Sequence, residues 1–253
     1  MRNNKLVLNS DKTHLLIMAS PNKHRKHGNF GITLNTGKER IEPIDSEILL
    51  GATLSNNFMW NQHIRDGEQA MIHTLNRKNT ALKKISQTTD FKTRNMIGSG
   101  LVMSSLSYII QVYGGCSNYL LNLLQVQQNN AARHITKLPW MTSTKVLLNQ
   151  CNWLSVRQLV VYHSMILLHG VLLTQKPNYI FKKLGDIQRE TRNTDSNSIL
   201  DRRKFKTTTA QRSYIPRAIS RWNSLPLEIR EIRTKSSFKQ ELKKYTKENI
   251  PVK

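Results

Sequence analysis

The sequence predicts a mainly α-helical protein with a small antiparallel β portion at its N-terminal end, an α+β class. Residues 119–135 carry apolar and small side chains at helical spacing, which indicates an amphipathic helix. Residues 154–173 place apolar groups at nearly every angle of a helical wheel, so we expect a helix buried on most sides. Short apolar runs bounded by turn-forming residues precede residue 58 and predict the strands.

The first of these helices has a well-defined inner face. Its stripe consists of Leu120, Leu121, Leu124, Gln128, Ala131, Ala132 and Ile135. Pro139 is expected to stop this helix, because proline lacks the N–H that a helix interior needs. The second helix must be wrapped by other elements, because an apolar wheel cannot face water on all sides.

The elements before residue 91 are shorter. We expect strands at residues 5–8 and 14–19, joined by a turn at residues 9–12, and further strands at residues 31–34 and 48–54. Residues 60–85 have apolar side chains at helical spacing and basic residues on the remaining surface, which predicts an amphipathic helix. Its basic side fits either a phosphate-binding surface or a solvated helix face.

The chain after residue 185 divides into a linker and a tail. Residues 186–209 are polar without periodicity and predict a flexible linker. A compact apolar set follows and contains Trp222, which we expect to anchor the tail by packing on the helical body. Ser237 and Gln240 have the spacing of a capping box before a short helix. The predicted parts are residues 1–57 (β), 58–185 (helical), 186–209 (linker) and 210–253 (basic helical tail).

The charge predicts a polyanionic partner. The formal net charge is +23 at pH 7, far more than solubility requires, and residues 91–185 contain no Asp or Glu. We expect RNA, DNA or an RNA–DNA hybrid to be bound, rather than an acidic membrane surface. The basic residues expected to contact it on the 60–85 helix and in the central region are Arg65, Arg77, Lys78, Lys83, Lys84, Arg133 and Lys137.

Other classes of protein fit less well. The sequence has no secretory signal pattern near its start, and polar residues interrupt the apolar stretch 96–113, so we expect an intracellular protein of the nucleus or cytoplasm that is neither secreted nor membrane-bound. Cys116 and Cys151 lack the closely spaced partners of a zinc site. We expect both to be reduced and packed as small apolar side chains.

Several motifs resemble reverse transcriptases of LINE-type (non-LTR) retrotransposons. Tyr113-Gly114-Gly115, the run 123–133, Leu147-Leu148 and the run 153–156 are similar, in order and spacing, to the region that follows that family's catalytic core. Residues 48–54, Trp60 with His63, and the tail runs 212–226, 229–230 and 238–243 extend the resemblance over about residues 8–245.

The resemblance implies the end of a polymerase palm, a helical thumb-like bundle and a basic tail. It also implies that Lys12, in a turn like the one that follows the family's catalytic aspartates, would face phosphate. The parent enzyme would be an RNA-directed DNA polymerase that uses Mg²⁺ ions, and an upstream polymerase portion, if encoded, would be a partner of this chain.

The catalytic centre of such an enzyme is missing from these residues. Two-metal phosphoryl transfer needs carboxylates that hold ions about 3.5–4 Å apart. The sequence contains no Asp-Asp pair, and its acidic pairs, 45 with 47, 66 with 68, and 228 with 231, lack strand flanks and are expected to face solvent. We therefore expect no catalytic, cofactor-binding or metal-binding residue. The function predicted is that of a truncated or degenerate reverse transcriptase that retains template–primer binding; the alternative is a free-standing basic helical RNA- or DNA-binding module.

Overall fold

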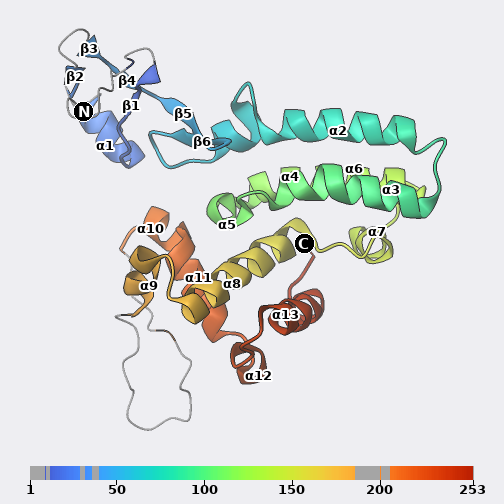
Figure 1. Ribbon diagram of the computed structural model, residues 1–253. Coiled ribbons are helices and arrows are strands. Elements are labelled where there is room, and N and C mark those ends of the chain that lie inside the picture. The colour runs from blue at the N-terminus through green and yellow to red at the C-terminus, as the bar shows by residue number, and fades with distance from the viewer. Residues whose placement is uncertain are drawn as a thin grey trace. The chain divides into compact units, whose positions relative to one another are not determined.

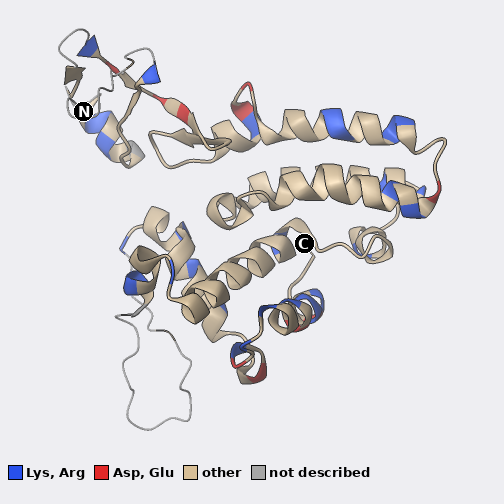
Figure 2. Ribbon diagram, in the orientation of Figure 1, with Lys and Arg blue, Asp and Glu red and all other residues tan. Residues whose placement is uncertain are grey.

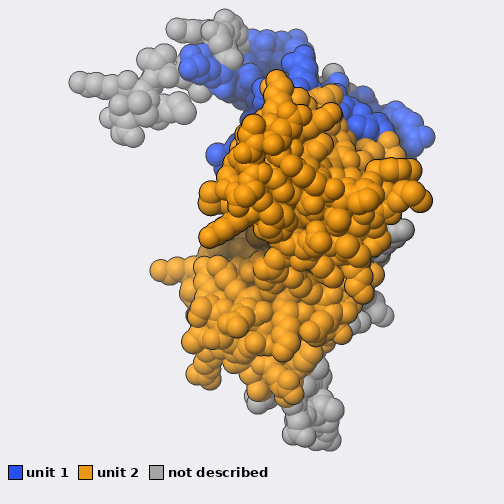
Figure 3. Space-filling model, turned by 90° about the vertical axis from the view of Figure 1, so that its right-hand side faces the viewer, with its two compact units in different colours: residues 1–71 blue, residues 72–253 orange. Residues whose placement is uncertain are grey.

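The fold is mainly helical, as predicted. The computed structural model describes residues 9, 12–28, 32–35, 40–185, 200 and 206–252. Among these the strands all lie before residue 56, so the small β portion is N-terminal (Figure 1). The chain divides into two compact units, residues 1–71 (unit 1, blue in Figure 3) and residues 72–253 (unit 2, orange). The sequence had placed the first division earlier, between residues 57 and 58.

The described part of unit 1 contains small two-stranded sheets, the short helix α1 (Pro21–His27) and, at its end, a π-helical turn. The strand pairs are β1 (Leu15–Leu16) with β4 (Pro43–Ile44), β2 (Leu34–Asn35) with β3 (Arg40–Ile41), and β5 (Ser46–Leu49) with β6 (Ala52–Ser55). The last two pairs are antiparallel as expected, whereas β1 and β4 are parallel. The strand predicted at residues 5–8 lies outside the described residues.

The single strand predicted at residues 48–54 is wrong. Residues on either side of Leu50 and Gly51 belong to the β5–β6 hairpin, in which Leu49 pairs with Ala52. Leu50 has φ 49° and Gly51 has φ 75°, the two positive values that a tight hairpin turn with the right twist requires. The apolar run across this turn resembles one strand in sequence, and only the glycine marks the reversal.

The helix predicted at residues 60–85 is also interrupted. It consists of a π-helical turn, η3 (Gln62–Asp66), and of α2 (Met71–Ile85). Gly67 adopts an extended conformation, and its N–H donates to the Gln62 carbonyl at 3.0 Å. Glycine has a low helix propensity, so the chain leaves the helical conformation at Gly67, and its N–H makes the last hydrogen bond of the π turn.

Helix α2, apart from its first residue, and all the helices that follow it belong to unit 2. The helices after α2 are α3 (Phe91–Gly98), η4 (Ser99–Met103, π-helical), α4 (Ser104–Ser107), α5 (Ile110–Tyr113), α6 (Asn118–Thr136), α7 (Thr144–Gln150), α8 (Val156–Thr174), α9 (Asn178–Gly185), α10 (Thr208–Arg212), α11 (Tyr214–Asn223), α12 (Leu227–Arg230) and α13 (Lys235–Asn249). The two long helices predicted from periodicity are α6 and α8. The predicted linker lies largely outside the described residues, and α10 begins within its predicted end.

Helix α6 buries the face that its sequence predicts. Its buried residues are Leu120, Leu121, Leu124, Gln128, Ala131, Ala132 and Ile135. A Cβ atom on Gly98 of α3 would lie 2.5 Å from Ile135 Cδ1, so glycine permits the close approach of α3 to α6. The helix ends at Thr136, where Lys137 takes a left-handed conformation (φ 56°), and not at Pro139.

A network of side-chain amides joins α6 to the start of α8. Gln128 is fully buried, and its Nε2 donates to the Leu154 carbonyl at 2.7 Å. Gln125 Oε1 accepts from the Val156 N–H at 2.9 Å, and Gln125 Nε2 donates to Gln128 Oε1 at 2.8 Å. Gln128 on the apolar stripe and Gln125 beside it both have hydrogen-bond partners, and together they fix the position of α8 against α6.

Helix α8 is the core helix of unit 2. A capping box starts it, with Ser155 Oγ accepting from the Gln158 N–H and Gln158 Oε1 accepting from the Ser155 N–H. It packs against α5, α6, α11 and α13. By length and composition it could cross a membrane, but more than half of that window is buried inside the protein, which accounts for its apolar sequence.

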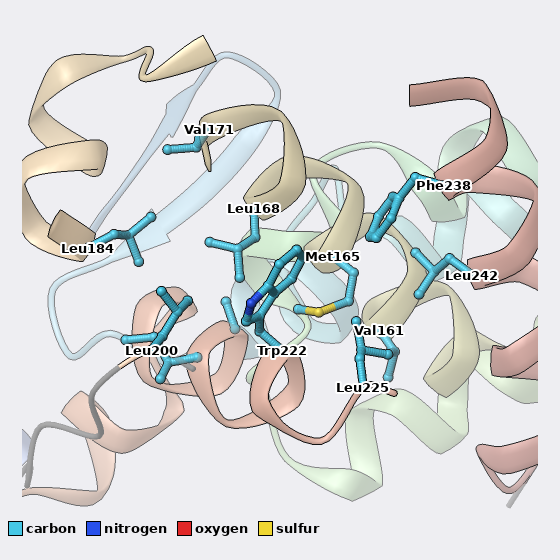
Figure 4. Close-up of a cluster of buried hydrophobic side chains, with 12 residues drawn as sticks. Val161, Met165, Leu168, Val171, Leu184, Leu200, Trp222, Leu225, Phe238 and Leu242 are labelled. Carbon is cyan, nitrogen blue, oxygen red and sulfur yellow. The ribbon is translucent and has the colours of Figure 1, made fainter. Parts of the chain in front are cut away.

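The tail packs on α8, as predicted. Figure 4 shows the cluster in which Trp222 of α11 meets Met165 and Leu168 of α8. Trp222 is 3% exposed, which confirms its packing role. The capping box predicted at Ser237 is wrong, because α13 begins at Lys235 after Thr234, so Ser237 already lies inside the first turn.

We expect Trp222→Ala to destabilise the fold, because truncation of a buried Trp leaves a cavity and costs about 3–5 kcal/mol. Urea unfolding followed by circular dichroism measures the change. The matched control is Trp140→Ala, since Trp140 is 79% exposed and its truncation should cost less than about 0.5 kcal/mol. An unfolding midpoint that Trp222→Ala leaves in place would contradict the packing role.

A buried histidine makes the stability of this cluster depend on pH. The His169 ring stacks on Phe238, with centroids 3.8 Å apart, and its Nε2 donates to the Ile232 carbonyl at 2.6 Å. Its Nδ1 is buried without a hydrogen-bond partner, so a second proton there has no acceptor. Burial therefore lowers the pKa of His169 below its usual 6.5, and nearby Lys235 lowers this pKa further, against the opposing effect of the Ile232 carbonyl.

Unfolded His169 takes up a proton more readily than the folded form, so the stability it contributes is complete above about pH 6.5 and is lost as the pH falls below that value. We expect urea unfolding midpoints to drop between pH 7.5 and pH 5.5, and to drop less in His169→Asn. The control is His73→Asn, on the exposed surface of α2, which should keep the wild-type pH dependence. An identical pH dependence in His169→Asn would exclude His169 as a source.

Candidate nucleic-acid interface

The C-terminal ends of α2 and α6 lie side by side. Asn79 Nδ2 of α2 donates to the carbonyl and to the side-chain Oε1 of Gln127 on α6, both at 3.1 Å. Lys83 lies one turn after Asn79 on α2, and His134 lies in the last turn of α6. Burial lowers the pKa of His134, and the positive charge of Lys83 lowers this pKa further. These contacts bring Lys83 and the last turn of α6 together.

Helix α3 brings a third end to the same place. Arg94 Nε donates to the Ile135 carbonyl at 2.8 Å, which puts the first turns of α3 against the last turn of α6. Figure 2 shows Lys and Arg residues at these ends of α2, α3 and α6. We call these residues the basic cluster: Lys83, Lys84, Lys92, Arg133, His134 and Lys137.

Little acid neutralises this charge. The ion pairs formed between described residues, those of Glu47, Glu42 and Asp66, all lie in unit 1. Asp90 is near in sequence, but its carboxylate accepts from the backbone N–H of Lys92 at 3.2 Å and of Thr93 at 3.3 Å and so caps α3. The lysines of the basic cluster are thus left to water, to the helix C-terminal dipoles or to an external anion.

Two arginines at this end serve the fold. Arg94 is buried and donates both to the Ile135 carbonyl and to the Thr89 carbonyl. Its positive charge therefore stabilises the C-terminus of α6 and is not free to bind a ligand. Arg133 is half-buried, and its Nη2 donates to the Trp140 carbonyl at 3.0 Å. Arg133 therefore holds the connection to α7, with part of its guanidinium left for another partner.

The predicted contact residues are only partly brought together. Lys83, Lys84, Arg133 and Lys137 lie in the basic cluster, whereas Arg77 and Lys78 lie at the middle of α2. Arg77 is exposed, with Nη2 3.5 Å from Thr74 Oγ1. Lys78 is half-buried, and its Nζ donates to Ser105 Oγ, so it is less available to a ligand.

The two predicted contact residues of unit 1 differ from each other. Lys12 is exposed in the expected turn, where its N–H donates to the Asn9 carbonyl at 3.3 Å. Arg65 is paired with Asp66, with Nη2 3.0 Å from Oδ2, so its charge is already neutralised. Of the two, Lys12 is the one that forms no ion pair with a residue that the structure describes.

Sequence reasoning did not single out three surface residues of this region. Lys92 and Lys145 fall within the acid-free stretch 91–185 but not among the predicted contact residues, and Trp140 belongs to no predicted helix. Lys145 is exposed on the first turn of α7, which Asn129 Nδ2 ties to α6 through Thr144 Oγ1 at 2.9 Å. The sequence did contain one signal for Trp140: a tryptophan directly after Pro139, at a position that continues no helical pattern, indicates a side chain outside the core.

The acidic pairs show no catalytic arrangement. Asp45 is exposed and accepts from Asn56 Nδ2 at 2.7 Å, and Glu228 and Glu231 are exposed on or beside α12. Within the described residues, no three His, Cys, Asp or Glu side chains are grouped so that they could hold a metal ion.

Both cysteines are free. Cys151 is buried and Cys116 is half-buried, as was broadly expected of small packed thiols. Burial raises the pKa of each thiol to about 11. Both therefore stay protonated at neutral pH, which makes them poor nucleophiles and poor metal ligands.

No protein-family model, curated protein or solved structure matches this chain. The resemblance to non-LTR reverse transcriptases therefore stays a prediction that rests on the motifs themselves.

Proposed function

We propose that this chain is a derivative of a LINE-type retrotransposon reverse transcriptase that binds nucleic acid, RNA, DNA or their hybrid, and lacks polymerase chemistry of its own. The observation that carries the binding function is the basic cluster, in which the ends of three helices present cations with no ion-paired acid among the described residues of unit 2. Contacts of this kind recognise phosphate, so the affinity depends little on base sequence.

The packing of the resembling motifs supports the polymerase origin. Gln125 and Gln128 belong to the run 123–133 and Leu154 and Val156 to the run 153–156, and the hydrogen bonds between them join the two runs directly. Trp153 of the second run donates from Nε1 to Ser99 Oγ at 3.0 Å. Residues that carry the resemblance thus hold the helical body together, which suits a thumb-like scaffold for a basic surface.

The alternative is a free-standing basic helical module with no polymerase context. The core of unit 2, built on α8, favours it, because this unit has an apolar centre of its own. The two candidates differ in ligand shape: a thumb derivative should prefer a primer–template hybrid duplex over a single strand of equal length and charge.

We expect the triple variant Lys83→Gln, Lys84→Gln, Lys137→Gln to bind a hybrid duplex more weakly and with a smaller dependence on salt. Each lost phosphate contact reduces the slope of log affinity against log salt by roughly 0.7–0.9, so three true contacts reduce it by about 2–3 units. Fluorescence anisotropy at several salt concentrations measures both quantities.

The matched control removes three exposed lysines from another helix, α13: Lys235→Gln, Lys239→Gln, Lys244→Gln. Both triple variants lose the same charge, so a purely generic polycation effect would weaken them equally. Equal losses would contradict the basic cluster as the binding site, and a wild-type salt slope near zero would contradict nucleic-acid binding itself.

We expect no primer extension by the isolated chain on an RNA template with Mg²⁺ or Mn²⁺, because no paired carboxylates were found to position two ions. The assay compares product with a no-protein control. Extension that disappears on replacing Asp45 or Asp66 with Asn would show that the chain holds a catalytic centre and would refute the proposal.

A further inference from the structure

The connection between α6 and α7 exposes a large aromatic side chain. Trp140 is 79% exposed and Met141 is 81% exposed, whereas Trp153 and Trp222 are 6% and 3% exposed. An indole ring that is 79% exposed contributes little burial to folding, so its presence at this place is not explained by stability.

The connection that carries Trp140 has a defined shape. Arg133 Nη2 donates to the Trp140 carbonyl at 3.0 Å, and the Thr142 N–H donates to the Pro139 carbonyl at 3.0 Å, which closes a turn around Trp140 and Met141. Pro139 also restricts the backbone at the first turn position. The ring is therefore presented by an ordered backbone, so that a ligand has little further ordering to impose.

Cations precede and follow this turn in the chain. The Arg133 guanidinium of the basic cluster bonds to the backbone of Trp140 itself, and Lys137 is exposed three residues before it. Lys145, which lies outside the basic cluster, is exposed on the first turn of α7, five residues after Trp140. The ring thus has positive charges before and after it in a stretch without acidic residues. This combination suits a ligand whose flat aromatic groups are attached to an anionic backbone.

We propose that Trp140 stacks against an unpaired base of the nucleic acid whose phosphates the basic cluster binds. This inference rests on the proposed function and adds a single-stranded segment to its ligand. Each base has a π-face, so stacking on an indole tolerates any sequence, as the phosphate contacts do. A base in a duplex is already stacked on its neighbours, so the ring selects an overhang or a single strand.

A membrane surface fits this region less well. Helices that lie on membranes carry a continuous apolar face. Helix α7 buries Leu147 and Leu148, and α6 buries its apolar stripe inside unit 2. The large apolar side chains that residues 137–150 leave exposed are Trp140, Met141 and Val146, which form no such face.

The test compares two probes of stated composition, a 20-nucleotide oligodeoxythymidylate and a blunt RNA–DNA hybrid of the same length. Stacking is worth about 1–3 kcal/mol per base, so Trp140→Ala should weaken binding of the single strand by about 5- to 150-fold. The salt slope and the affinity for the blunt hybrid should stay unchanged, because no cation is removed. Trp140→Phe should restore part of the loss, and binding of the single strand should quench the fluorescence that wild type has and Trp140→Phe lacks.

The matched control is Tyr179→Ala, since Tyr179 is 68% exposed and has Lys182 and Lys183 on the same short helix α9. It should bind both probes like wild type. If Trp140→Ala binds the single strand as wild type does while the salt slope persists, the stacking proposal is overturned and the proposed function stands. If wild type binds neither probe, both fail. A loss by Trp140→Ala that is confined to phosphatidylserine vesicles would overturn stacking in favour of a membrane contact.

Discussion

The architecture of unit 2 depends on two amide side chains, one fully buried (Gln128) and one half-buried (Gln125). Gln128 and Gln125 satisfy backbone groups just before and at the start of α8, and a buried polar group left without a partner would cost about 1–3 kcal/mol. Leucines alone would specify the register of the two helices less sharply, because apolar burial is non-directional whereas a hydrogen bond requires one particular backbone partner. The amides allow one register. That register sets where α6 ends, and its end carries the cations of the basic cluster.

The basic side chains of this protein have two kinds of environment. Cations that are drawn inward bond to backbone carbonyls: Arg94 meets the end of α6, and Arg217 of α11 donates from Nη2 to the Gln111 carbonyl at 3.0 Å. Burial lowers the pKa of neighbouring Arg221 to about 10. Cations at the helix ends stay in water, where mutual repulsion opposes compactness. A polyanion would relieve that repulsion, so binding and stability are coupled through the same residues.

The sequence predicted the elements whose signal is repeated over several turns. The inner face of α6 was confirmed residue by residue, and α8 is buried over about half of its residues, because each turn adds evidence for one orientation. Features decided by one residue were missed, such as the reversal at Gly51 and the break at Gly67. The basic cluster was predicted only in part. Its lysines could be named from composition, but their proximity follows from the packing of α2 on α6. The exposure of Trp140 could not be predicted, because the loop that carries it has no hydrophobic periodicity.

Gln158 ties the start of α8 to the end of the chain. Its Nε2 donates to the Thr246 carbonyl at 3.2 Å and to the Ile250 carbonyl at 2.9 Å, so its side-chain hydrogen bonds are completed by residues 88 and 92 positions later. At about 5–20 residues per second, a ribosome needs roughly 4–15 s to pass from the end of α8 to Ile250. During that interval α5 and α6 are already available to α8, but the side that α11 and α13 bury is still exposed, and a nascent-chain chaperone would find its apolar surface there.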